Sequence, residues 1–143
     1  MFADTLPLKM QKDELEMFLA REFSQISDEI EIAELTESQV TMRLVASDKH
    51  LRPGGTISGP TMFMLADVCF YLALLSVLGP QALTVTTSAH ISFMRKPSPA
   101  PLLATARRLK LGKTLAIGDV LLFSEGMEAP VAHASMTYAI PPA

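Results

Sequence analysis

A long apolar run near the middle of the chain limits the possible folds more than any other segment. Nearly every residue from 61 to 78 is apolar, and its only charged side chain is Asp67. Pro60 suits the first turn of a helix, where a missing N–H costs nothing, and Gly79-Pro80 would end the helix. The pattern therefore predicts a helix over residues 59–78 that is buried on all sides.

A membrane-spanning helix is the alternative for this run, because its length is at the lower limit for crossing a bilayer. However, Asp67 lies inside the run, and no Lys or Arg flanks it as an interfacial anchor. The segments that follow alternate polar and apolar residues as soluble sheets do. We therefore predict a helix that is buried by protein, and no membrane partner.

Strand candidates lie on both sides of this helix, marked by alternation and by β-branched residues. Two precede it, at residues 29–32 and 40–45, and four follow it, at residues 83–94, 102–110, 114–123 and 131–140. An amphipathic helix at residues 12–23 comes first. Strands grouped before and after one buried helix favour an antiparallel sheet wrapped around that helix, which is an α+β architecture.

Composition favours one globular domain. The chain has 143 residues, of which 49% are apolar and 19% are charged. We expect a single domain over residues 1–143, with residues 1–27 as its N-terminal helix and lead-in.

A net charge of −3 argues against a nucleic-acid partner. The first ten residues lack the pattern of a secretory signal, so the expected location is cytoplasmic.

Two residues of the central helix are candidates for chemistry. A carboxylate at Asp67, among apolar neighbours, is costly to bury unless a partner stabilises it, so it marks either a functional site or a structural Asp bonded to a Thr or Ser of the sheet. Cys69 is either a small buried hydrophobe or a catalytic thiol, but no neighbouring cation favours its thiolate.

The loop before the helix is rich in glycine. Residues 54–60 lead directly into the helix N-terminus, where glycine lets a backbone approach a ligand and free N–H groups favour negative charge. A thioester carbonyl that is attacked by water becomes an oxyanion, which such donors stabilise. A tight turn is the simpler explanation for the glycines.

Residues 50–67, continued by residues 86–97, resemble the phenylacetate-pathway branch of the 4-hydroxybenzoyl-CoA thioesterase superfamily. The likeness extends over about residues 47–138 and is strongest at Leu65-Ala66-Asp67. It implies a hotdog fold, in which an antiparallel β-sheet wraps around a long central helix. It also implies hydrolysis of an acyl-CoA thioester with an aryl or medium-chain acyl group, releasing free coenzyme A and a carboxylic acid.

The resemblance assigns catalytic roles by position. Asp67 corresponds to the carboxylate that acts as general base or nucleophile, and the N–H of Gly59 to the donor that polarises the thioester carbonyl. Thr86 corresponds to a hydroxyl that orients water from the neighbouring strand. Ser58 stands where the family usually has His, and it would hydrogen-bond near the carbonyl. Simple alternation places Thr86 on the opposite strand face from Ala89.

Four further residues are expected to bind substrate. Arg52 stands at the family's Asn position, and Arg52, Arg95 and Lys113 are candidates for binding the anionic groups of coenzyme A. Such charges are also common on a solvated sheet edge. Phe63, on the central helix, is expected to contact the acyl group.

The remaining expectations concern metals, partners and rival functions. The three histidines show no metal-ligand spacing, so we expect no metal, and no cofactor besides the coenzyme A of the substrate. Because the family builds each site at a dimer interface, a homodimer or a homotetramer (a dimer of dimers) is implied. Ser58 and Arg52 leave open a non-catalytic acyl-CoA or fatty-acyl binding protein. A hotdog hydratase or dehydratase would need a His beside Asp67.

Overall fold

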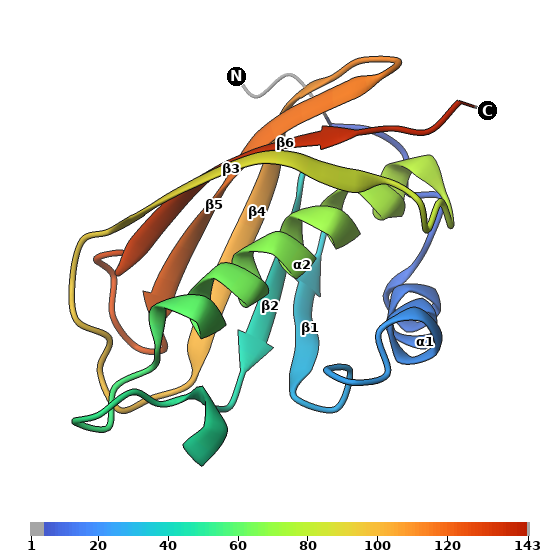
Figure 1. Cartoon of the computed structure of the whole chain (residues 1–143). Helices are drawn as coiled ribbons and strands as arrows, with labels where there is room; N and C mark the ends of the chain where they lie inside the picture. Colours follow the sequence, from blue (N-terminus) through green and yellow to red (C-terminus); the bar gives the residue numbers. More distant parts are fainter. Residues whose placement is uncertain (1–4, 143) are drawn as a thin grey trace.

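The computed structural model describes residues 5–142 and shows one long helix held in the concave face of a curved six-stranded sheet (Figure 1). The elements, in chain order, are α1 (Lys12–Glu22), β1 (Ile30–Leu35), β2 (Gln39–Leu44), the 3₁₀ helix η1 (Asp48–His50), α2 (Gly59–Leu78), β3 (Val85–Phe93), β4 (Leu102–Leu111), β5 (Leu115–Ser124) and β6 (Ala132–Ala139). The strand order is β1-β2-β4-β5-β6-β3, and every neighbouring pair is antiparallel. The predicted α+β hotdog fold is therefore confirmed.

The central helix α2 begins and ends as its sequence predicts. Ser58 caps its start by accepting a hydrogen bond from the Thr61 N–H, and Gly79 ends it with a φ of 94°. The helix is long and apolar enough to cross a membrane by those two criteria alone, but 78% of its 18-residue window is buried inside the protein. This burial is typical of the core helix of a globular domain.

Small residues on the inner face of the sheet let α2 approach closely. Ala104 and Ala106 of β4 are fully buried beneath it. At Gly118 of β5, an added Cβ would lie 2.2 Å from Cε1 of Phe70. Glycine is therefore required at this position, because any side chain would displace the ring that α2 packs onto the sheet.

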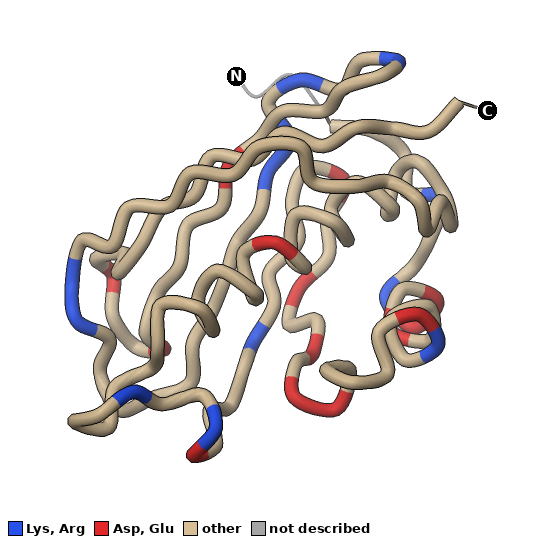
Figure 2. The backbone as a smooth tube through the Cα atoms, in the orientation of Figure 1, with Lys and Arg blue, Asp and Glu red and all other residues tan. Residues whose placement is uncertain are grey.

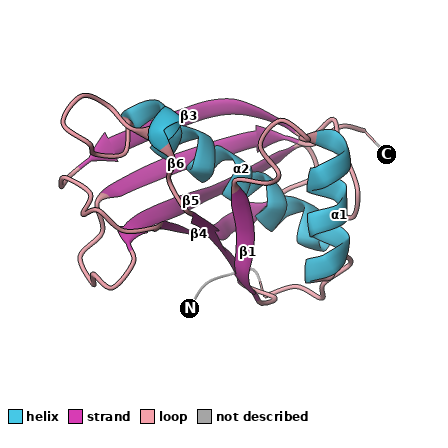
Figure 3. Ribbon diagram, turned by 90° about the horizontal axis from the view of Figure 1, so that it is seen from below, coloured by secondary structure: helices cyan, strands magenta, loops and turns pink. Residues whose placement is uncertain are grey.

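The helix α1 covers one end of α2 (Figure 3). Its buried residues are Leu15, Phe18 and Leu19, which follow the predicted apolar spacing. Of the predicted N-terminal helix and lead-in, residues 1–4 lie outside the described residues. The 3₁₀ helix η1 was not predicted. It forms because the Ser47 N–H donates to Nδ1 of His50 at 2.9 Å, so a side chain three residues ahead closes the turn.

Strand β3 lies at the edge of the sheet and contains a β-bulge. Thr86 pairs with Tyr138 and Ser88 pairs with Thr137, so Thr87 is an extra residue in β3. The bulge reverses the alternation, and Thr86 faces α2 together with Ala89. The prediction that these two residues lie on opposite faces was therefore wrong, because regular alternation cannot include an inserted residue.

Candidate active site

Asp67 is held by two hydroxyl groups of the sheet. Thr86 donates to its Oδ1 at 2.7 Å, and the Tyr138 hydroxyl lies 2.6 Å from the same oxygen and 2.9 Å from the Asp67 main-chain oxygen. Asp67 is the only charged residue of α2, and Figure 2 shows the acidic positions of the chain in red along the backbone. Hydrogen bonds of this kind stabilise a carboxylate that is taken partly out of water.

Asp67 lines a cavity, and one of its carboxylate oxygens is without a protein donor. Within residues 5–142, Oδ2 accepts no hydrogen bond from the protein. The cavity has a volume of about 320 Å³. Its lining residues are Phe23, Asp67, Val68, Tyr71, Ala82, Thr84, Val85, Thr86 and Tyr138. We call this space the Asp67 cavity. It offers a ligand an apolar, aromatic wall with one carboxylate.

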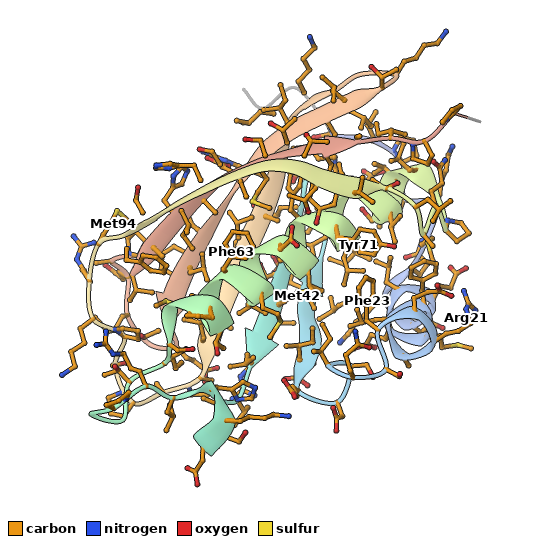
Figure 4. The ribbon with its side chains drawn as sticks, viewed as in Figure 1. Arg21, Phe23, Met42, Phe63, Tyr71 and Met94 are labelled. Atoms are coloured by element: carbon orange, nitrogen blue, oxygen red, sulfur yellow. The ribbon has the colours of Figure 1, made fainter. Side chains whose placement is uncertain are left out.

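Aromatic rings form the wall of the Asp67 cavity. Phe23 meets Tyr71 edge to face, with ring centroids 5.4 Å apart, and both side chains are labelled in Figure 4. The Tyr71 ring lies 6.3 Å from that of Tyr138, and its hydroxyl donates to the Ala82 main-chain oxygen at 3.1 Å. Burial and the nearby Asp67 charge raise the pKa of Tyr138, so its hydroxyl keeps its proton at physiological pH.

A second cavity, which we call the Gly59 cavity, lies at the start of α2. It has a volume of about 630 Å³. Its lining residues are Arg52, Pro53, Gly54, Thr56, Ile57, Gly59, Met62, Phe93, Arg95, Lys96 and Pro97. Three predicted site residues, namely Arg52, Gly59 and Arg95, therefore meet here, and Lys96 adds a third cation. The Arg95 Nη1 is held at 2.7 Å from the Pro130 main-chain oxygen.

The N–H of Gly59 is the available donor at the start of α2. Pro60 has no N–H, and the Thr61 and Met62 N–H groups both donate to Ser58. Within residues 5–142, the Gly59 N–H has no acceptor. Helix starts leave their first N–H groups without partners inside the helix, so this one is free to receive an anionic oxygen.

Gly59 and Asp67 do not meet within one chain. They are eight residues apart on one helix, which separates them by about 12 Å along its axis. Each borders its own cavity. They share one stripe of α2 with Phe63, which is 39% exposed between them. The two halves of the predicted catalytic set are therefore on one helix face but in separate cavities.

Three predicted site residues lie outside both cavities. The Ser58 hydroxyl caps the helix and lies 2.8 Å from the Thr61 hydroxyl. Lys113 is exposed in the turn between β4 and β5, at the far end of the molecule from the start of α2 (Figure 1). Phe63 stands on the open face of α2. None of these three lines the Asp67 cavity or the Gly59 cavity.

The other reactive side chains lie elsewhere. Cys69 is fully buried and burial raises its pKa to about 12, which agrees with a small hydrophobe and not with a catalytic thiol. His50 bonds to Glu29 at 2.8 Å and His133 to Asp119 at 3.0 Å. All three histidines are in the described part of the chain, and none of them lines the Asp67 cavity. No cluster of metal-ligating side chains occurs among residues 5–142.

Comparison with known proteins gives the family. The thioesterase superfamily profile matches residues 54–131, which is more than half of the chain. The chain belongs to the thioesterase superfamily. This membership confirms the broader part of the resemblance seen in the sequence. A search of the curated proteins found no match to this chain.

Solved structures agree with the family. A candidate thioesterase from Silicibacter sp. TM1040 is 56% identical, with 96% of each chain covered and a TM-score of 0.90. Zebrafish thioesterase superfamily member 2 is 19% identical, with 93% of this chain and 100% of that chain covered and a TM-score of 0.82, so it shows the fold alone.

The phenylacetate-pathway branch is a distant relation. A variant of the phenylacetic acid degradation protein from Thermus thermophilus is 24% identical, with 82% of this chain and 99% of that chain covered and a TM-score of 0.71. At that identity the likeness again shows the fold alone. The narrower part of the resemblance therefore stays a prediction for this superfamily member.

Tyr138 is the site residue that the sequence analysis missed. It occupies a buried position of the last strand, where a tyrosine hydroxyl normally needs a hydrogen-bond acceptor. That rule predicts an acceptor without saying which one. Only the packing of α2 on the sheet places the hydroxyl against Asp67.

Proposed function

We propose that this chain hydrolyses acyl-CoA thioesters to free coenzyme A and a carboxylic acid, with an aryl or medium-chain acyl group. The observation that carries the proposal is Asp67, which lines an apolar cavity and whose Oδ1 is held by Thr86 and Tyr138 while Oδ2 has no donor among residues 5–142. In this reaction the carboxylate takes a proton from the attacking water, or attacks the carbonyl carbon itself. The free N–H of Gly59 stabilises the oxyanion that forms.

The reaction needs Gly59 and Asp67 together, which a second subunit would provide. Strand β3 has an open edge, and Val85 and Phe93 near its two ends are each 52% exposed. Pairing β3 with the β3 of another copy, antiparallel, puts the Phe93 end of one strand beside the Thr86 end of the other.

This pairing joins the two halves of the site. An added Cβ at Gly59 would lie 3.3 Å from the Phe93 ring, so Gly59 marks the Phe93 end of β3, and Asp67 marks the Thr86 end. The exposed stripe with Phe63 would be covered at the same time. We therefore propose a homodimer in which each site takes Gly59 from one chain and Asp67 from the other. A homotetramer would be a dimer of such dimers.

The substrate would lie across both cavities. Arg52, Arg95 and Lys96 of the Gly59 cavity suit the phosphate groups of coenzyme A. The acyl group would enter the Asp67 cavity of the other chain, against Phe23 and Tyr71. These aromatic walls suit an aryl group, and a flexible medium-chain tail also fits them. A phosphate role for Lys113 and a cytoplasmic location stay predictions.

The test is release of free coenzyme A, detected with a thiol reagent. The panel runs from acetyl-CoA through medium-chain esters to phenylacetyl-CoA and benzoyl-CoA, with Asp67→Ala as control. We expect turnover that is lost in the variant, and the ranking of the esters identifies the acyl class. Turnover that survives in Asp67→Ala at the wild-type rate would refute the mechanism.

A non-catalytic acyl-CoA binding protein is the second candidate. It is favoured by Ser58, which replaces the family's His and whose hydroxyl is already used in the helix cap. This function predicts acyl-CoA binding by calorimetry without release of coenzyme A from any ester. A hydratase or dehydratase lacks comparable support, because no His lines the Asp67 cavity in the described chain.

A further inference from the structure

We propose that Tyr138 is a positioning residue for Asp67, which fixes one carboxylate oxygen and leaves Oδ2 as the single oxygen that reacts. The inference rests on the proposed thioester hydrolysis and deepens it. The Tyr138 hydroxyl lies 2.6 Å from Oδ1 and 2.9 Å from the main-chain oxygen of the same residue. The Tyr138 hydroxyl therefore contacts both the side chain and the backbone of Asp67.

Two donors converge on one oxygen because of the sheet register. Thr86 of β3 and Tyr138 of β6 are direct partners, and both face α2. With two hydroxyls on Oδ1 and no protein donor on Oδ2 within residues 5–142, the two oxygens of Asp67 are not equivalent. A carboxylate held in this way cannot exchange its oxygens by rotation without breaking two charge-assisted hydrogen bonds.

Packing fixes the direction of the Tyr138 hydroxyl. The residue is only 3% exposed, and its ring meets that of Phe70 at 5.4 Å and that of Tyr71 at 6.3 Å. A rigid ring loses little conformational freedom when its hydroxyl forms a hydrogen bond. Its raised pKa keeps the hydroxyl protonated, so it acts as a donor throughout the working pH range. These properties suit a residue that orients a neighbouring carboxylate.

The experiment compares Tyr138→Phe with Thr41→Val in the full chain. Both variants remove one hydroxyl, but that of Thr41 bonds to the Thr105 hydroxyl at 3.0 Å, and Thr41 lines neither the Asp67 cavity nor the Gly59 cavity. The readouts are kcat and KM for the best ester, with thermal unfolding to verify folding.

For Tyr138→Phe we expect kcat to fall about 10- to 100-fold, with KM changed by less than about threefold, because a hydrogen bond to a charged group is lost. This split between kcat and KM distinguishes a positioning role from a merely structural one. Thr41→Val should change neither kcat nor KM by more than about twofold.

A Tyr138→Phe enzyme with the kcat of Thr41→Val would overturn this inference alone, provided that Asp67→Ala is inactive. Should Tyr138→Phe unfold, Thr86→Val tests the fixed oxygen of Asp67, because it removes the other donor to Oδ1 without changing the aromatic wall. An unchanged kcat in that folded variant would also overturn the inference. A wild-type chain that hydrolyses no ester would overturn the proposed function and this inference together.

Discussion

Thr86 and Tyr138 are paired residues of neighbouring strands, and their hydroxyls meet at the same oxygen of Asp67, at 2.7 and 2.6 Å. This convergence depends on the bulge at Thr87. Because of the extra residue, the side chains of Thr86 and Ala89 lie on the same face of β3, toward α2. A single inserted residue therefore decides whether the carboxylate of α2 has one donor or two.

Replacing Thr86 by Val should lower kcat about 10- to 100-fold, because the isosteric methyl group cannot donate to Oδ1. Thr86→Ser keeps the hydroxyl and should retain activity within about fivefold of the wild type. Steady-state kinetics with the best ester measure both. If the two variants lose activity equally, the hydroxyl is not what matters at this position.

Replacing Gly59 by Pro should lower kcat by about 100-fold or more, because it removes the N–H that stabilises the oxyanion. Pro is tolerated at a first helical position, and Ser58 already has the extended backbone that precedes Pro, with φ −74° and ψ 154°. Gly59→Ala is the matched control. It keeps the N–H while adding a Cβ 3.3 Å from the Phe93 ring, so it should lose much less activity.

Mixing two inactive variants should restore activity if each site draws on two chains. A hybrid of an Asp67→Ala chain and a Gly59→Pro chain has one site with both native residues, so refolding the variants together should recover a measurable fraction of wild-type turnover. Native mass spectrometry would verify that hybrids form, because the two variant chains differ in mass. No recovery in confirmed hybrids would place both residues of a site in one chain.

Acid stability should depend on Asp119, far from the proposed reaction. Burial would raise the pKa of Asp119, but hydrogen bonds from Arg107 and His133 outweigh it and hold the pKa below its ordinary value. A carboxyl with a lowered folded pKa stabilises the protein above its unfolded pKa of about 3.9, and this contribution is lost as pH falls through the folded value.

Asp119→Asn should therefore lower the free energy of unfolding by about 1–2 kcal/mol at pH 7, a modest value because Arg107 and His133 are partly exposed. The difference from wild type should shrink below about pH 4. Urea unfolding between pH 7 and 3 measures it, with the exposed Glu128→Gln as control. A constant difference across that range would contradict this account.

Much of the fold could be predicted because its signals are local. Apolar spacing, the proline at the start of α2 and the glycine at its end predict the observed bounds of that helix. The strand candidates after it differ from β3, β4, β5 and β6 only by a few terminal residues. The 3₁₀ helix at Asp48–His50 escaped prediction because it depends on one side-chain hydrogen bond to Nδ1 of His50.

The candidate site was harder to predict, because its residues come from distant segments. Asp67 stood out as a charge in an apolar run, and its bond to Thr86 joins two of the residues that the resemblance had assigned to catalysis. Arg52 and Arg95 do share a cavity with Gly59, but Lys113 lies apart from it. Tyr138 carries no local mark that distinguishes it from an ordinary core tyrosine.

The order of residues alone thus decided that a buried helix would carry one carboxylate within an antiparallel sheet, because burial and periodicity are properties of neighbouring residues. Only the tertiary structure decided which hydroxyls hold that carboxylate and which of its two oxygens they hold. It also decided that Gly59 and Asp67 lie in separate cavities. Strand register, a one-residue bulge and the 1.5 Å rise of a helix set those relationships, and each acts between residues far apart in the chain or along a whole element.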